Sequence, residues 1–232
     1  TAASTFGAIK FSKNACSGLL FSEEIKNLES ALKENKQILS IVGGSKISTK
    51  LKVIHNLLPN SSAIVVGGGI ANTFLKAAGN SIGKSIVEDD MLDTAKELLS
   101  TNKIILPKHV YVSATPQSND VDLIPVEDVP ENKMILDIEL NENKISQNEE
   151  YIIWNGPLGI FEIDKFSNGT KQLIAFLENS KSKVIAGGGE TLFAINKFSD
   201  TSKFHYVSTA GGAFLEYLSG NQLPSIEALR LK

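Results

Sequence analysis

The sequence predicts an α/β fold, a Rossmann-like three-layer α/β/α domain with a mostly parallel sheet. Short, continuously apolar runs recur along the 232-residue chain, and each is followed by a glycine-containing turn and then by a segment of helical periodicity. Continuous runs are typical of strands buried on both faces, whereas alternating runs indicate one exposed face. Strand–turn–helix units in series form parallel sheets with right-handed crossovers.

The predicted strands and helices alternate along the chain. Strands are expected in the apolar runs 38–42, 63–66, 151–154, 184–186 and 205–208. Helical segments are expected after these runs, at about 46–58, 70–78, 165–180, 190–198 and 213–219. A helix at 21–34 precedes the first strand, and another at 89–99 leads to a short apolar run at 104–106.

The stretch 107–150 departs from this pattern. It holds four of the seven prolines, many acidic residues, and short apolar runs such as 121–126 and 134–138. Proline cannot donate to a strand ladder and favours edges and turns. We therefore predict a small irregular or antiparallel excursion from the main sheet and not a separate domain.

Composition narrows the class of protein. The hydrophobic fraction is 42% and no run approaches the ~18 apolar residues of a membrane span. Residues 1–11 lack the charged and then apolar pattern of a signal peptide, and the single cysteine, Cys16, excludes an internal disulfide. A net charge of −3 argues against a nucleic-acid surface. These features predict a cytoplasmic monomer without nucleic-acid or membrane partners.

Arginine is nearly absent from the chain. Of 23 basic residues, Arg230 alone is an arginine. Two-pronged recognition of carboxylates or phosphates normally uses arginine. An anionic ligand is therefore expected to be held by lysines, backbone N–H groups and a metal ion.

Glycine-rich turns follow all five main strands, at 43–44, 67–69, 155–159, 187–189 and 209–212. Ligands of open α/β sheets bind beyond the carboxyl ends of the strands, where these turns would gather. Glycine lets the backbone approach a ligand, and each helix start adds partial positive charge. One Gly-Gly pair is most simply a tight turn, but five turns on one edge predict a phosphate-binding rim.

Two familiar phosphate motifs fail on spacing. The segment 79–85 (GNSIGKS) resembles a P-loop, but three residues separate its glycines where the motif needs four, and it follows a helical segment. The dinucleotide fingerprint is not met after the second strand, because Asn72 occupies the place of the third glycine. We predict a plain loop at 79–85.

Charged residues near the glycine turns have two readings. Lys46 and Lys50 lie four residues apart at the start of a predicted helix, so they share one face; they are either solvated or in contact with phosphate. Glu190 either complements the helix dipole or holds Mg²⁺, with Thr191 and nearby N–H groups on phosphate oxygens. Glu162 is placed to accept from ribose hydroxyls. No nucleophile–base pair is evident, and phosphoryl transfer needs none.

Five sequence motifs resemble those of one known protein family. They are IVGGSKISTK (41–50), IVVGGGIANTF (64–74), YIIWNGPLGIFE (151–162), IAGGGETLFAI (185–195) and VSTAGGAFLEYLSG (207–220). In order and spacing they resemble the C-terminal, nucleotide-binding half of phosphoglycerate kinase. Residues 3–25 resemble the interdomain helix of that family, so residues 1–20 are expected to be its remnant and 21–232 the nucleotide-binding domain.

The resemblance implies an activity and a site. The family transfers a phosphoryl group between 1,3-bisphosphoglycerate and MgADP, in glycolysis, giving 3-phosphoglycerate and ATP. By motif, Lys50 is similar to the lysine on the nucleotide phosphates and Lys46 to the one that steadies the migrating group. The resemblance further implies a catalytic set of Lys46, Gly189 and Gly212, a metal position at Glu190, and nucleotide contacts from Gly44, Ser45, Lys50, Gly68, Gly69, Asn155, Pro157, Glu162, Gly188, Gly189, Glu190, Thr191 and Gly211.

Three positions depart from the family pattern. Glu190 stands where aspartate is usual, Ala210 stands in a run of three glycines, and Glu139 stands where the family has the glycine of an Asp-Ile-Gly at the adenine. The family's N-terminal half carries the histidine and arginines that bind phosphoglycerate. The chain is expected to lack that half, which would be its partner, and to bind MgADP or MgATP without turnover by itself.

Two other classes remain open at this stage. One is the dinucleotide domain of an oxidoreductase, and the other is a non-catalytic nucleotide-binding module. Binding of NADH but not ADP would favour the first. Failure of a phosphoglycerate kinase N-terminal half to restore activity would favour the second.

Overall fold

A computed structural model describes residues 7–32, 37–146 and 148–230. Its main sheet is parallel throughout and has the strand order β3-β2-β1-β7-β8-β9. This is the order of a doubly wound nucleotide-binding fold. The predicted α/β class is therefore confirmed. The strands are β1 (Ile38–Val42), β2 (Ser61–Val66), β3 (Ile104–Ile105), β7 (Tyr151–Asn155), β8 (Lys183–Ala186) and β9 (Tyr206–Val207).

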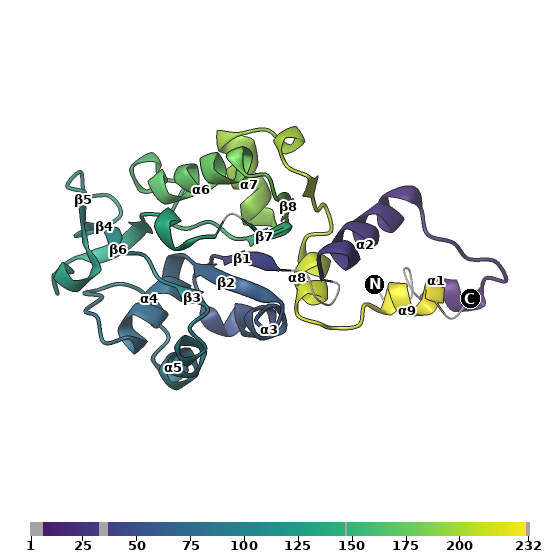
Figure 1. Ribbon diagram of the computed structural model, residues 1–232, viewed down its shortest axis with the longest axis horizontal. Coiled ribbons are helices and arrows are strands. Elements are labelled where there is room, and N and C mark those ends of the chain that lie inside the picture. Colours follow the sequence, from purple (N-terminus) through teal and green to yellow (C-terminus); the bar gives the residue numbers. More distant parts are fainter. Residues whose placement is uncertain (1–6, 33–36, 147, 231–232) are drawn as a thin grey trace.

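Helices cover both faces of this sheet (Figure 1). One face carries α3 (Ile47–Leu57), α4 (Gly68–Ala77), α5 (Leu92–Ser100) and α8 (Gly212–Leu218). The other carries α6 (Asn168–Asn179) and α7 (Gly189–Phe198). The chain also makes short 3-10 turns, named η2 (Asp89–Met91), η3 (Val126–Asp128), η4 (Glu142–Lys144), η5 (Asp164–Phe166) and η6 (Thr201–Lys203).

Burial on both faces explains the continuous apolar runs. In β1, Leu39 and Ile41 join the core under α6 and α7, while Ile38 and Val42 join the core under α3 and α8. Successive strand residues point to opposite faces, so a strand with two covered faces is mostly apolar. The one polar residue of β1, the buried Ser40, is hydrogen-bonded to the Ser61 hydroxyl at 2.7 Å. The adjacent strand β7 divides its side chains in the same way.

The excursion after β3 forms a second, antiparallel sheet with the order β5-β4-β6, as predicted. Its strands are β4 (His109–Ser113), β5 (Asp122–Pro125) and β6 (Met134–Ile138). The sequence analysis did not identify β4. The segment 79–85 is a loop, as predicted, and a bridge from Gly83 to Met134 ties it to this sheet.

Several predicted boundaries shift by a few residues. The helix expected at 165–180 begins at Asn168, because 164–166 form the 3-10 turn η5. The helix expected at 21–34 is α2 (Leu19–Leu32), and its last two predicted residues lie outside the described residues. The short helix α9 (Pro224–Arg230) was not predicted, although proline at a first helical position is a start signal.

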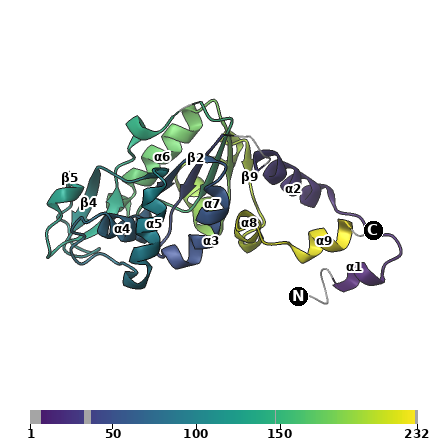
Figure 2. The ribbon, with the colours of Figure 1, turned by 60° about the horizontal axis from the view of Figure 1, so that its bottom comes forward.

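Three helices lie to one side of the sheet in both views, namely α1 (Ala8–Phe11), α2 and α9 (Figures 1 and 2). The hydroxyl of Tyr206 donates to Glu24 Oε2 at 2.8 Å and joins α2 to β9. Phe11 and Leu19 are each 92% exposed on this side. The boundary predicted at residue 20 falls inside α2, and residues 1–6 of the predicted remnant lie outside the described residues. No helix in the described part of the chain is long and apolar enough to cross a membrane.

Candidate functional site

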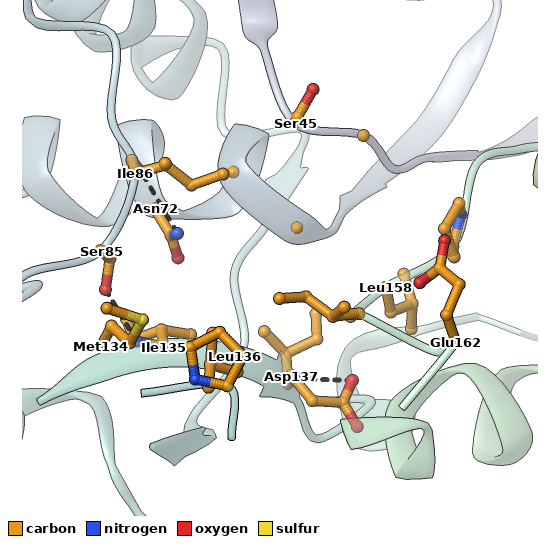
Figure 3. Close-up of a pocket in the computed structure, with 18 of the residues that line it drawn as sticks. Ser45, Asn72, Ser85, Ile86, Met134, Ile135, Leu136, Asp137, Leu158 and Glu162 are labelled. Atoms are coloured by element: carbon orange, nitrogen blue, oxygen red, sulfur yellow. Dashed lines mark hydrogen bonds between the residues drawn. The ribbon is translucent and has the colours of Figure 1, made fainter. Parts of the chain in front are cut away.

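A cavity of about 370 Å³ opens where the strand order reverses. The helix after β1 packs on one face of the sheet and the helix after β7 on the other, and ligands of open α/β sheets bind at such a reversal. Figure 3 shows the cavity between these loops and β6 of the small sheet. Predicted site residues among its lining are Gly44, Ser45, Gly68, Gly69, Pro157, Glu162 and Glu190.

The loops after β1 and β7 cross with their backbones in contact. A Cβ on Gly43 would lie 1.9 Å from the carbonyl oxygen of Pro157, and one on Gly156 would lie 2.2 Å from that of Gly43. Gly156 also has φ +98°, which a side chain disfavours. The Gly43 N–H donates to the Asn155 carbonyl at 2.9 Å. The close packing of the two loops requires glycine at these positions. Ligand binding is not needed to explain them.

The turn after β2 packs against the crossing of the loops after β1 and β7. The Gly68 N–H donates to the Leu158 carbonyl at 2.8 Å. A Cβ on Gly69 would lie 2.1 Å from the carbonyl oxygen of Ser45, and Gly68 has φ +63°. The wall of the cavity is therefore backbone held against backbone.

Three predicted site glycines have no such packing reason. A Cβ on Gly189, Gly211 or Gly212 would meet nothing within 4 Å. Gly189 begins α7 and Gly212 begins α8, beyond the carboxyl ends of β8 and β9. The first N–H groups of a helix have no intrahelical partner, so these helix starts are suited to bind an anion.

Lys50 projects from α3 into the loop crossing. Its ammonium donates to Asn155 Oδ1, and Asn155 Nδ2 in turn donates to the Gly187 carbonyl at 2.7 Å. Burial lowers the pKa of Lys50 to about 8, against the opposing influence of the Glu190 carboxylate. The side chain is thus a partly dehydrated cation placed between the turns after β1, β7 and β8.

Other predicted site residues hold the loops or stand apart. Thr191 is fully buried, and its hydroxyl accepts from the Gly156 N–H at 2.8 Å. Asn155 is also buried, and both its Oδ1 and its Nδ2 are hydrogen-bonded. A Cβ on Gly188 would lie 2.5 Å from Asn155 Nδ2. Lys46 is exposed at the start of α3 and does not line the cavity.

The acidic residues of the cavity are few. Glu162 and Glu190 are both exposed at its edge. Within residues 7–32, 37–146 and 148–230 no three His, Cys, Asp or Glu side chains gather as a metal cage. One carboxylate beside a phosphate site fits Mg²⁺, which keeps its waters and binds through one or two carboxylates plus phosphate oxygens.

The comparisons with known proteins agree with this geometry. The family model described as phosphoglycerate kinase matches residues 1–221. The chain belongs to the phosphoglycerate kinase family. A phosphoglycerate kinase from Francisella philomiragia is 47% identical over 99% of the chain, and one from Psychrobacter cryohalolentis is 43% identical over 96%. This ancestry decides against both the oxidoreductase and the unrelated binding module.

Solved phosphoglycerate kinases share the fold. The structure from Coxiella burnetii has a TM-score of 0.92 at 42% identity and covers 99% of this chain. The one from Pyrococcus horikoshii has a TM-score of 0.80 at 27% identity and covers 92%. The chain spans 62% of the length of the Francisella philomiragia protein, 60% of the Psychrobacter cryohalolentis protein, and 62% and 57% of the two solved chains.

The sequence analysis placed one further residue only by resemblance, as the aspartate of the family's Asp-Ile-Gly at the adenine. Asp137, on β6, is 1% exposed and lines the cavity. Its carboxylate accepts from the Gly169 N–H and the Ile138 N–H, each at 2.9 Å. Burial raises its pKa to about 7, although these N–H groups act in the opposite direction. An acid inside the apolar run 134–138 was the available signal.

Asp137 supplies the missing cap of α6. That helix begins at Asn168, and Ser167 before it makes no side-chain cap bond. A carboxylate at a helix N-terminus satisfies free N–H groups and complements the helix dipole. The cap therefore joins the small sheet to α6.

Asp137→Ala is expected to lower the free energy of unfolding by about 2 kcal/mol, because the Gly169 and Ile138 N–H groups lose their acceptor while buried. Urea unfolding at neutral pH measures this loss. Asp122→Ala is the matched control. Asp122 is exposed on β5 and pairs with Lys133, so its removal should cost less than about 1 kcal/mol. Equal losses in the two variants would contradict the capping role.

Proposed function

We propose that this chain binds ADP and ATP with Mg²⁺ in the cavity, as the nucleotide side of a phosphoglycerate kinase. The reaction is phosphoryl transfer between 1,3-bisphosphoglycerate and ADP. One observation carries the proposal: an apolar cavity where the strand order reverses lies beside the first turn of α7 and beside the dehydrated lysine Lys50. A base fits the first part and phosphates fit the second.

The cavity suits a flat, apolar-faced ring. Its walls are mainly the side chains of Ile86, Met134, Leu136, Leu158 and Ile160. Small-molecule sites are mostly apolar and carry a few placed polar groups, and about 370 Å³ lies within their usual size. The carboxylate of Glu162, at the edge, is placed for the ribose hydroxyls.

The phosphates would lie across Lys50, Gly188 and Gly189. Lys50 supplies charge, and the first N–H groups of α7 supply donors. Glu190, in the same first turn, would be the protein ligand of the nucleotide-bound Mg²⁺. Thr191 would contribute indirectly through the loop that its hydroxyl fixes.

The transferred group would lie between Lys46, Gly189 and the Gly211–Gly212 turn. Phosphoryl transfer depends on positioning and charge neutralisation, and these groups supply both without a side-chain base. Arg230 is committed to Glu29 at 2.7 Å and faces Glu227, so the chain offers no arginine clamp for phosphoglycerate. Turnover would require the family's N-terminal half. The chain alone would bind nucleotide but would not turn over substrate. A monomeric state and a cytoplasmic location remain predictions.

Calorimetric titration with MgADP tests the proposal, and saturable one-to-one binding is expected. Glu190→Ala should weaken ADP binding at least about tenfold with Mg²⁺ present, because loss of one charged ligand costs roughly 1.4 kcal/mol or more. In excess EDTA the same variant should bind ADP like the wild type. Glu97→Ala, an exposed acid on α5, is the control. An equal loss with and without Mg²⁺ would place the metal elsewhere, and no binding of ADP would refute the proposal itself.

A further inference from the structure

An asparagine in the cavity has an acceptor without a donor. Asn72, on α4, is 2% exposed and lines the cavity. In the described part of the chain, only two buried side-chain polar atoms lack a hydrogen-bond partner, and Asn72 Oδ1 is one of them. The other, Glu24 Oε1, lies far from the cavity on α2. Buried acceptors are normally satisfied, so this one calls for a partner.

The orientation of the amide is fixed by its other end. Asn72 Nδ2 donates to the carbonyl of Ile86 at 3.2 Å. The flipped amide would set Oδ1 against that carbonyl, so the hydrogen bond assigns the oxygen to the opposite side. Figure 3 shows the nitrogen toward Ile86 and the oxygen turned toward Met134 and the β6 side of the cavity.

Two other polar side chains that line the cavity are already bonded. The Ser85 hydroxyl donates to the Ile82 carbonyl and accepts from the Ile135 N–H at 2.8 Å. Both oxygens of Asp137 accept backbone N–H groups. Unlike them, Asn72 Oδ1 is a buried acceptor without a partner on a residue that lines the cavity.

The layout of the cavity places a base beside this oxygen. In Figure 3, Glu162 and Leu158 lie on one side of the cavity, and Asn72, Ser85, Ile86 and Met134 lie on the other. A nucleoside whose ribose is at Glu162 extends its base toward Asn72. Ile86 and Met134 would cover the ring, while the edge of the ring meets the amide.

We propose that Asn72 Oδ1 accepts a hydrogen bond from the 6-amino group of bound adenine, which makes Asn72 a specificity-determining residue. This inference rests on the proposed function. A buried acceptor favours a donor at this edge, since a base without one leaves the acceptor unpaired. An adenine nucleotide satisfies the oxygen, and a purine that carries only hydrogen at position 6 does not.

The probe is purine riboside 5′-diphosphate, which is ADP without the amino group. The 232-residue chain should bind MgADP about tenfold more tightly than the Mg²⁺ complex of this probe, as one hydrogen bond implies. Calorimetric titration measures both affinities. A difference within about twofold would overturn the inference whatever any variant does, because the oxygen would then be satisfied by water.

The variant Asn72→Leu keeps the side-chain shape and removes the acceptor. It should bind ADP and the probe within about twofold of each other, with the loss confined to ADP. Asn80→Leu is the matched control, because Asn80 lies just after α4, bonds to Leu75 and does not line the cavity. Asn72→Ala gives the same comparison if the leucine variant does not fold. A tenfold preference that survives in both Asn72 variants would overturn the inference.

The results also separate this inference from the proposed function. Binding of ADP by the wild type without preference over the probe would leave the nucleotide site in place and remove the role of Asn72. Absence of any ADP binding would refute both.

Discussion

Gly43→Ala is expected to lower the free energy of unfolding by about 3 kcal/mol, the upper part of the usual cost of forcing an added methyl into a packed site. The new Cβ would lie 1.9 Å from the Pro157 carbonyl oxygen and 2.7 Å from that of Gly156. Both are backbone atoms, so no rotamer change relieves the contact. The loops after β1 and β7 would have to separate, and the hydrogen bond from Gly43 to Asn155 would be strained.

Urea denaturation followed by circular dichroism measures the change, and Gly189→Ala is the matched control. An added Cβ at Gly189 meets nothing within 4 Å, and the residue begins α7, where alanine is tolerated. Its stability should change by less than about 1 kcal/mol. Similar losses in the two variants would mean that the loop crossing does not depend on the missing side chain at Gly43.

Lys50→Met is expected to weaken MgADP binding roughly 100-fold, because a hydrogen-bonded charge contributes about 1.5–3 kcal/mol and each 1.4 kcal/mol is tenfold. Methionine keeps much of the length and packing of the side chain but removes its charge. Lys52→Met, two residues along α3 and exposed, is the control and should bind ADP normally. Equal affinities of the Lys50 variant and the wild type would remove Lys50 from the phosphate site.

The lowered pKa of Lys50 predicts that ADP binding depends on pH. Burial sets its pKa at about 8, so the ammonium is present below pH 8 and is lost as pH rises through that value. Phosphate binds the protonated form, hence ADP affinity should fall between about pH 7 and pH 9, with proton uptake on binding at the upper end. Calorimetry in buffers of different ionisation enthalpy measures that uptake. In Lys50→Met this dependence should disappear.

Local sequence accounts for most of the main sheet. The run 38–42 is apolar at four of its five positions because both of its faces are covered, and β1 has these bounds. The small sheet was harder to predict. In β4, burial alternates along 109–112 and the strand has five residues, so its signal is weaker than that of the continuous apolar runs in the main sheet. The helix α9 was missed because a seven-residue segment carries little periodic signal.

The candidate site was predictable only in outline. Glycine turns after strands indicated where a ligand would bind, and Gly44, Gly68, Pro157 and Glu190 do line the cavity. Nothing in the sequence distinguished a glycine that packs from one that is open. Gly43 and Gly189 both sit in glycine runs, yet one meets a carbonyl and the other meets empty space.

By itself the sequence determined the fold class, the edge of the sheet where the cavity lies, and the resemblance to phosphoglycerate kinase. These follow from local periodicity and from motifs that lie within short segments. Tertiary structure alone decided that Thr191 holds a loop, that Asp137 caps α6 and that the buried Asn72 Oδ1 has no hydrogen-bond partner. Each of these depends on which distant backbone atom lies opposite a side chain. That pairing is set by how strands and loops pack, which no short segment encodes.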